Sequence, residues 1–237
     1  TPRRILGNPR ESITEADKHL ENIMCPYVRN CFDQALKHPE LRSAGLVMSH
    51  TCDSVYRIAG LWDYHTLPAY FQIINVPHKS SDAALQFFKN ELIFFKEKLE
   101  AFSGQTITNE KLLEAIEIYN KIRGLVRSIY DFRKEDPPRL SGIEMLHLLV
   151  AGCRTSPSAF CKILKYAYDE ISERNIPEQA SKPRIMVYGC IIDDEFVFQL
   201  IEESDAHVVI DDTCIGTRIY SNDIEITEDP MDGLAKC

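Results

Sequence analysis

The sequence predicts an α/β protein with two Rossmann-like parallel-sheet halves joined by a helical segment. The main observation is a pattern of apolar strand, turn, helix and apolar strand that occurs twice, over residues 44–76 and 184–212. Between the two occurrences, apolar residues recur at helical spacing instead. We therefore expect a first α/β half at 1–105, a helical segment at 106–180, and the start of a truncated second half at 181–237.

The individual elements follow from apolar spacing and from residues typical of helix starts and stops. Apolar and β-branched runs predict strands at 46–49, 69–76, 184–189 and 206–212. Helical periodicity predicts helices at 25–37, 53–65, 82–102, 108–134, 142–151, 156–173, 193–203 and 229–237.

Two helices carry apolar stripes that predict which face is buried. The helix at 25–37 should bury one face, and the helix at 82–102 should pack its aromatic pairs in the core. The residues concerned are Val28, Cys31, Phe32 and Ala35 in the first helix, and Phe87-Phe88 and Phe94-Phe95 in the second.

Composition and charge argue against several classes of protein, among them nucleic-acid-binding and membrane-spanning proteins. The chain has 237 residues, of which 44% are hydrophobic and 27% charged, as in globular proteins. A net charge of −9 argues against a nucleic-acid backbone as partner. No apolar run reaches the length of about 18 residues that a membrane span needs. The first residues contain no apolar signal core, so we expect a cytoplasmic protein, and we expect this chain to be an internal piece of a longer one.

The eight cysteines are spread along the chain and contain no CxxC pair, which disfavours zinc ribbons and disulfide scaffolds. Four of them lie on apolar helix or strand faces and are expected to be structural: Cys31, Cys153, Cys161 and Cys190. Cys25 and Cys52 instead stand at loop–helix junctions, where free backbone amides stabilise anionic sulfur. Iron–sulfur clusters need several thiolates from such turns. From the residues alone, a shared cluster and buried structural thiols both remain open.

Four motifs occur in an order that resembles a known family. They are Cys25-Pro-Tyr-Val-Arg29, His50-Thr-Cys-Asp-Ser54, Ser141-Gly-Ile-Glu-Met-Leu-His-Leu-Leu-Val150 and Val209-Ile-Asp-Asp-Thr-Cys-Ile-Gly-Thr-Arg218. Together they resemble the 2-hydroxyacyl-CoA dehydratase and benzoyl-CoA reductase family, from about residue 12 to the end of the chain.

The resemblance implies a cofactor and its ligands. Cluster-bearing subunits of this family hold a 4Fe–4S cluster through three cysteines and leave one iron open. Carried over by motif, Cys25 and Cys52 are two of these ligands, and their sulfur atoms should lie within about 7 Å of each other at a cleft. The family's third ligand lies in a later segment than this chain contains. Cys214 and Cys237 match that position imperfectly.

The resemblance also implies an enzyme and its partners. Such subunits pair with a related or identical subunit, and an ATP-dependent iron–sulfur activator protein supplies a low-potential electron for a CoA thioester. The favoured reaction is (R)-2-hydroxyacyl-CoA dehydration, and ring reduction of the benzoyl-CoA type is the alternative. A non-catalytic or degenerate partner subunit without a complete cluster, or a related double-cluster protein that reduces small molecules, also remains open.

Five further residues are candidates for the cluster surroundings or the substrate cleft, each beside a structural alternative. Asp53 and Ser54 would bond the cluster sulfurs or cap a helix. Arg218 would meet a CoA phosphate or an internal carboxylate. The other two are His50, as a donor near the cluster or a packed histidine, and Asp212, in the cleft or at a helix start. Arg29 is a weaker candidate, near the cluster or a partner subunit.

Overall fold

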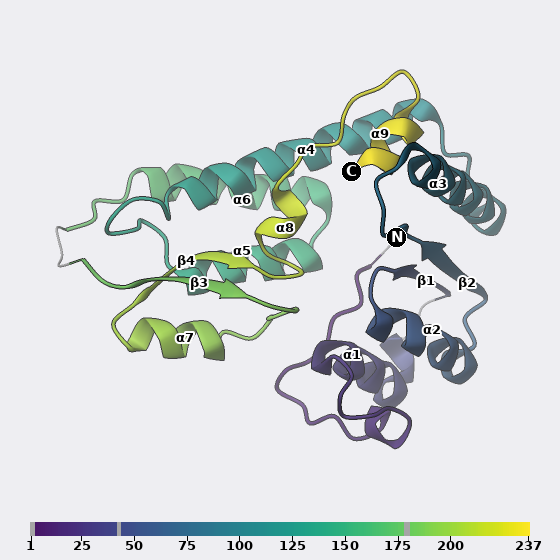
Figure 1. The fold of residues 1–237 in the computed structure, drawn as a ribbon, viewed down its shortest axis with the longest axis horizontal. Coiled ribbons are helices and arrows are strands. Elements are labelled where there is room, and N and C mark those ends of the chain that lie inside the picture. The colour runs from purple at the N-terminus through teal and green to yellow at the C-terminus, as the bar shows by residue number, and fades with distance from the viewer. Residues whose placement is uncertain (1–2, 42–43, 178–180) are drawn as a thin grey trace. The chain divides into compact units, whose positions relative to one another are not determined.

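A computed structural model describes residues 3–41, 44–177 and 181–237 (Figure 1). It is a mixed α/β structure, mostly helical, with two small parallel sheets of two strands each among the described residues. The chain forms two compact units. One unit contains Glu114–Asp223, and the other contains Ile5–Leu113 together with Ile224–Cys237.

The unit that begins at Ile5 contains the first strand–helix–strand pattern. Strands β1 and β2 pair in parallel, from Gly45 opposite Tyr70 to His50 opposite Asn75. The C-terminal helix α9 lies against α3, where the Lys89 ammonium is 2.7 Å from the carboxylates of Asp229 and Asp232 (Figure 1). The elements are η1 (Ala16–Lys18), α1 (Pro26–Lys37), η2 (Pro39–Leu41), β1 (Gly45–His50), α2 (Asp53–Thr66), β2 (Tyr70–Asn75), α3 (Asp82–Ser103) and α9 (Pro230–Lys236).

The core of this unit forms where α1 meets α2 and β1. The ring centroids of Phe32 and Trp62 are 5.3 Å apart, and Ile58 is fully buried beside them. The face of α1 predicted to be apolar is buried, because the spacing of its residues places them on one side of the helix. That prediction is therefore confirmed for all four residues, Val28, Cys31, Phe32 and Ala35.

The prediction that the aromatic pairs of α3 pack in the core is wrong. None of the residues of α3 is buried, and Phe87 and Phe94 remain 47% and 44% exposed. The helix contacts β2 and α9, but this unit's sheet has only two strands. A sheet of that width has too little surface to cover a helix with apolar residues on several sides.

The other unit contains the helical segment and the second strand–helix–strand pattern. Strands β3 and β4 pair in parallel with a register shift between Ile185 and Met186. One core lies among α4, α5 and α6, and a second lies between the sheet, α5 and α7. The elements are α4 (Asn109–Asp131, which starts in the first-described unit), α5 (Gly142–Arg154), α6 (Pro157–Ser172), β3 (Arg184–Tyr188), α7 (Phe196–Glu203), β4 (His207–Asp212) and α8 (Thr217–Tyr220).

Local sequence signals account for several helix starts. Ser141 and Glu144 form a reciprocal capping box at α5, and the Ser156 hydroxyl caps α6. Helix α7 starts later than predicted, because the Asp194 carboxylate accepts the Phe196 N–H at 2.9 Å and holds a turn before the helix.

The four cysteines predicted to be structural differ in their surroundings. Cys31 is buried, and Cys153 and Cys161 are half-buried against the cores. Cys190 is exposed, so the expectation of a buried apolar position is wrong there. It lies in the loop, two residues after the end of β3.

In the part of the chain that the structure describes, no helix combines the length and the apolar character needed to cross a membrane.

Candidate functional site

The two cysteines predicted as cluster ligands occupy equivalent positions at two helix starts. Cys25 is the N-cap residue of α1 and Cys52 is the N-cap residue of α2. The carbonyl of each accepts the first helical hydrogen bond, at 3.1 Å in both cases. Neither side chain makes a capping hydrogen bond to its own helix. The thiols are therefore not used for capping, unlike the Ser141 and Ser156 hydroxyls.

Ser54 joins the two cysteine turns. The backbone N–H of Cys25 donates a hydrogen bond to the Ser54 hydroxyl oxygen at 3.3 Å. Ser54 lies in the first turn of α2, two residues after Cys52. Of the two roles predicted for Ser54, capping of α2 is therefore not seen. The structure brings the two turns side by side, and the role of the cysteines as ligands stays a prediction.

A polar face of α1, which sequence reasoning missed, holds the segment that leads to Cys25. Oδ1 of the buried Asp33 carboxylate accepts hydrogen bonds from three consecutive backbone amides, those of Thr14, Glu15 and Ala16, at 2.9, 2.6 and 2.9 Å. Oδ2 lies 2.6 Å from the Lys37 ammonium. Burial acts to raise the pKa of Asp33, but the hydrogen bonds from Lys37 and these amides outweigh it and lower the pKa.

Arg29 belongs to the same polar face. Its guanidinium is largely buried and donates to the Asp17 carboxylate at 3.0 Å through Nε, and to the Asn22 carbonyl at 3.3 Å. Arg29 therefore holds the loop that precedes Cys25. From the sequence, Arg29 is predicted to lie near the cluster or a partner subunit. Its observed bonds to Asp17 and Asn22 could not be predicted, because they join residues that do not belong to one helix.

A pocket of about 530 Å³ opens beside the start of α2. Two predicted residues, His50 and Asp53, line it together. The His50 ring stacks on the Tyr56 ring, with centroids 4.0 Å apart and planes inclined by 20°, and His78 approaches His50 edge-on at 6.0 Å. His50 is thus packed on one side while it lines the pocket. The complete lining is His50, Asp53, Tyr56, Arg57, Gly60 and Ile73.

The Asp211-Asp212 pair divides between the core and the surface. Asp211 is buried, where its carboxylate accepts from the Arg133 guanidinium at 2.6 Å and from the Tyr130 hydroxyl at 2.8 Å. Burial raises the pKa of Asp211, and the Arg133 charge opposes that effect. This buried network connects α4 to β4, and its members are too far apart in sequence for a local pattern to reveal it.

Asp212 faces the other way and binds Arg218. The Arg218 Nε donates to the Asp212 carboxylate at 3.0 Å, and its Nη1 lies 3.8 Å from the Cys214 sulfur. The guanidinium lies 5.7 Å from the centre of the exposed Tyr188 ring. Hydrogen bonding to Asp212 raises the pKa of Arg218. The structure thus shows Arg218 on an internal carboxylate, in a different unit from Cys25 and Cys52.

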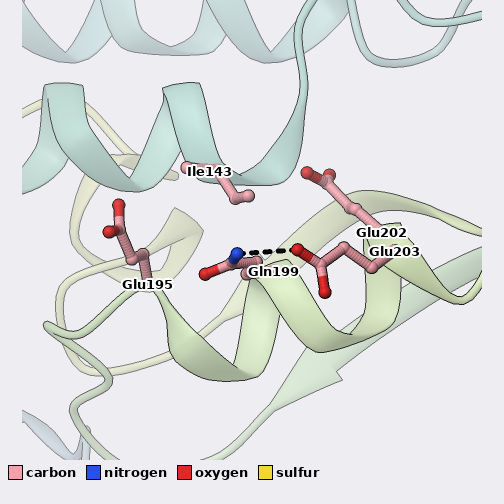
Figure 2. A pocket seen from close by; sticks show the side chains of 5 residues that line it. All are labelled: Ile143, Glu195, Gln199, Glu202 and Glu203. Carbon is pink, nitrogen blue, oxygen red and sulfur yellow. Dashed lines mark hydrogen bonds between the residues drawn. The ribbon is translucent and has the colours of Figure 1, made fainter.

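A second pocket, of about 480 Å³, lies between α5 and α7 and contains none of the predicted residues (Figure 2). Its acidic side chains have partners within the unit. Gln199 donates to Glu203 at 2.7 Å, Glu202 accepts the backbone N–H of Gly142 at 2.6 Å, and Glu195 lies 2.7 Å from the His147 imidazole. The contacts of Glu202 and Glu195 hold α7 against α5, and the Gln199–Glu203 hydrogen bond lies within α7.

The donor set fits an iron–sulfur cluster in part. Two thiols from adjacent helix starts have the chemistry and the surroundings that a cluster requires. Over residues 3–41, 44–177 and 181–237, however, no group of three or more His, Cys, Asp or Glu side chains is arranged to hold a metal ion. A third ligand is therefore not identified among these residues.

Comparison with known proteins assigns the family. Residues 1–237 match the family model described as 2-hydroxyglutaryl-CoA dehydratase, D-component. The chain is 24% identical over 232 residues to one of the benzoyl-CoA reductase subunits of Thauera aromatica, with 97% of this chain and 60% of the relative covered. It is 23% identical over 236 residues to the (R)-phenyllactyl-CoA dehydratase beta subunit of Clostridium sporogenes, with 99% and 63% covered.

A third relative is a putative dehydratase subunit, YjiM, of Escherichia coli (strain K12), which is 26% identical over 234 residues. The alignment covers 95% of this chain and 60% of that protein. The chain thus spans about 60% of the length of the curated relatives it matches. Because the family model matches the chain over its whole length, the chain belongs to the 2-hydroxyglutaryl-CoA dehydratase D-component family, which the sequence motifs predicted.

Proposed function

We propose that this chain is part of an iron–sulfur subunit that acts on acyl-CoA thioesters by one-electron reduction, with (R)-2-hydroxyacyl-CoA dehydration as the reaction. Cys25 and Cys52 would be two ligands of a 4Fe–4S cluster. The observation that supports this most is the direct link between the two helix starts, through the Cys25 N–H and the Ser54 hydroxyl. Side chains from separate turns must converge in this way to share one cluster.

The electrostatics of the two turns support the ligand roles. Backbone N–H groups in the first turn of a helix point out of the helix end, and the helix dipole favours negative charge there. Two thiolates and an anionic cluster would be stabilised at such a place. When bound, the cluster would supply a low-potential electron and, at an iron without a cysteine ligand, a Lewis acid for the substrate.

The pocket beside α2 would receive the substrate. Asp53 follows Cys52 directly and lines this pocket, so the pocket adjoins the proposed cluster site. Arg57 offers a positive charge and fixed N–H donors to a thioester oxygen or a phosphate. The Tyr56 ring and Ile73 offer an apolar wall to the acyl chain.

Partners and location belong to the same proposal. The relatives carry the names of subunits of larger enzymes. We expect this chain to pair with a related or identical subunit and to receive its electron from an ATP-dependent iron–sulfur activator protein. We also expect it to work in the cytoplasm, where thiols stay reduced.

Substitution of Cys52 by serine tests the proposal. The protein would be purified anaerobically with its partner subunit, and iron, sulfide and the EPR spectrum would be measured. Cys52→Ser should lose at least half of the iron, because serine is a poor cluster ligand, while Cys190→Ser, at an exposed cysteine of the other unit, should keep it. Unchanged iron in Cys52→Ser would remove that residue from the ligand set, and an iron-free wild type after reconstitution would overturn the proposal.

Two alternatives to this proposal can be tested. The chain is 24% identical to a benzoyl-CoA reductase subunit and 23% identical to a dehydratase subunit. The first match therefore favours a ring-reducing enzyme about as strongly as the second favours dehydration. The second alternative is a partner subunit without a complete cluster. Turnover of a panel of 2-hydroxyacyl-CoA and benzoyl-CoA substrates distinguishes ring reduction from dehydration. The iron content of the purified protein shows whether the subunit holds a cluster.

A further inference from the structure

We infer that Ser54 is a positioning residue that sets the spacing of Cys25 and Cys52. This inference rests on the proposed function. It assigns Ser54 to a hydrogen bond between the two ligand-bearing turns, and not to contact with substrate or to capping of its own helix. The hydroxyl oxygen accepts the Cys25 N–H at 3.3 Å, which is a polar link between residues 29 positions apart.

The geometry explains why this link would control the thiols. Cys52 and Ser54 belong to one rigid helical turn, which the hydrogen bond from the Tyr56 N–H to the Cys52 carbonyl closes at 3.1 Å. On the other side, the carbonyl of Cys25 accepts the Arg29 N–H at 3.1 Å and is fixed to α1 in the same way. The Ser54 bond joins these two rigid turns through a backbone amide. This bond uses neither sulfur atom, so it holds the two backbones together without occupying a thiol.

The packing of the two helices does not make this bond redundant. The Phe32 and Trp62 rings, whose centroids are 5.3 Å apart, join α1 and α2, and Val28 and Val55 pack in the same core nearer the cysteines. These contacts are apolar and therefore not directional, so they hold the helices together without fixing the distance between the two cysteine turns as a hydrogen bond does. Without Ser54, the Cys25 N–H loses its partner in a half-buried place, and a backbone donor without a partner favours movement toward water.

The test uses three variants of the full chain. Ser54→Ala removes the acceptor, and Ser54→Thr restores a hydroxyl. Ser49→Ala is the matched control, because Ser49 lies at the same β1–α2 junction and its hydroxyl contacts Thr51 at 3.4 Å, not the Cys25 turn. The melting temperature of each variant, measured by circular dichroism, shows whether it is folded.

The first measurement uses phenylarsine oxide on the iron-free protein. Two As–S bonds form to a pair of neighbouring thiols, the oxide oxygen leaves as water with the two thiol protons, and arsenic stays trivalent. Both thiols are then protected from iodoacetamide, which peptide mass spectrometry detects at Cys25 and Cys52 separately. Joint protection should require about threefold to tenfold more reagent in Ser54→Ala, which corresponds to the loss of one hydrogen bond, and should be normal in Ser54→Thr and Ser49→Ala.

The second measurement uses the reconstituted protein together with its partner subunit. Release of iron to a chelator should be about threefold to tenfold faster in Ser54→Ala, with an altered EPR signal, and Ser54→Thr should restore both. The inference is overturned if Ser54→Ala matches the wild type in both measurements, or if the arsenical fails to protect the two cysteines together in the wild type. If the wild type stays free of iron after reconstitution, the proposed function fails, whereas the arsenical result still decides the role of Ser54.

Discussion

At the scale of single residues, Asp33 organises the segment that leads to the proposed site. One buried carboxylate holds three consecutive amides and a lysine, and these amides stand just before η1 and at its first residue, where no helical hydrogen bond satisfies them. Replacement by asparagine keeps the shape but removes the charge and places N–H groups opposite N–H groups. Buried hydrogen bonds to a charged acceptor are among the stronger single contributions to stability.

Asp33→Asn should therefore lower the free energy of unfolding by about 2–4 kcal/mol at neutral pH. Because folding lowers the pKa of Asp33, its contribution is complete above the ordinary value of 3.8 and is lost as the pH falls through the lower folded value. The difference between wild type and variant should thus shrink below that pH. Urea titrations followed by Trp62 fluorescence measure it. Glu97→Gln, at an exposed carboxylate of the same unit, is the control and should change little.

At the scale of elements, the turn between β4 and α8 shows why a glycine follows Cys214 in its motif. A Cβ atom at Gly216 would lie 2.3 Å from the Asp211 carbonyl oxygen and 2.6 Å from its carboxylate. The Thr217 hydroxyl donates to the same carbonyl at 3.0 Å. The turn is therefore packed directly on the buried aspartate.

Gly216→Ala should destabilise the protein by about 1–3 kcal/mol, because neither the backbone nor the buried carboxylate has room to move. Gly124→Ala is the matched variant within α4, where the nearest atom is 4.0 Å from the added carbon. It should stabilise the protein by about 0.5–1 kcal/mol through helix propensity. Thermal unfolding followed by far-ultraviolet circular dichroism compares the two, and equal effects would contradict the close approach at Gly216.

At the scale of the whole molecule, each of the two compact units has a hydrophobic core of its own. The chain's one tryptophan, Trp62, is buried in the unit that contains the cysteine turns. Its fluorescence therefore reports on that unit, whereas far-ultraviolet circular dichroism reports on both. Units with separate cores need not unfold in one transition.

We expect the two probes to separate in two variants. Asp211→Asn leaves the buried Arg133 without its counter-charge, which costs about 3–5 kcal/mol, and should shift part of the dichroism transition while the Trp62 transition stays in place. Asp33→Asn should instead shift the Trp62 transition. Coincident shifts of both probes in both variants would show that the units unfold as one.

The sequence by itself determined the order of the longer helices and of the strands, the buried face of α1 and the family. These depend on spacing along the chain: apolar residues at helical intervals, serine caps such as Ser141 and Ser156, and short motifs around Cys25 and Cys52. Such features act over a few residues and can be read locally. The same reasoning misjudged Phe87, Phe94 and Cys190, because apolar character alone does not say how much surface is available to cover a side chain.

Only the tertiary structure decided which polar residues meet. It showed the Asp33 carboxylate on the amides of a preceding loop, Asp211 between Arg133 and Tyr130, and the Cys25 amide on Ser54. These partners are 17 to 81 positions apart, and any carboxylate or hydroxyl at a suitable distance would serve equally well. Their pairing depends on how the helices and sheets pack, since a buried polar group must find a partner wherever the fold places one.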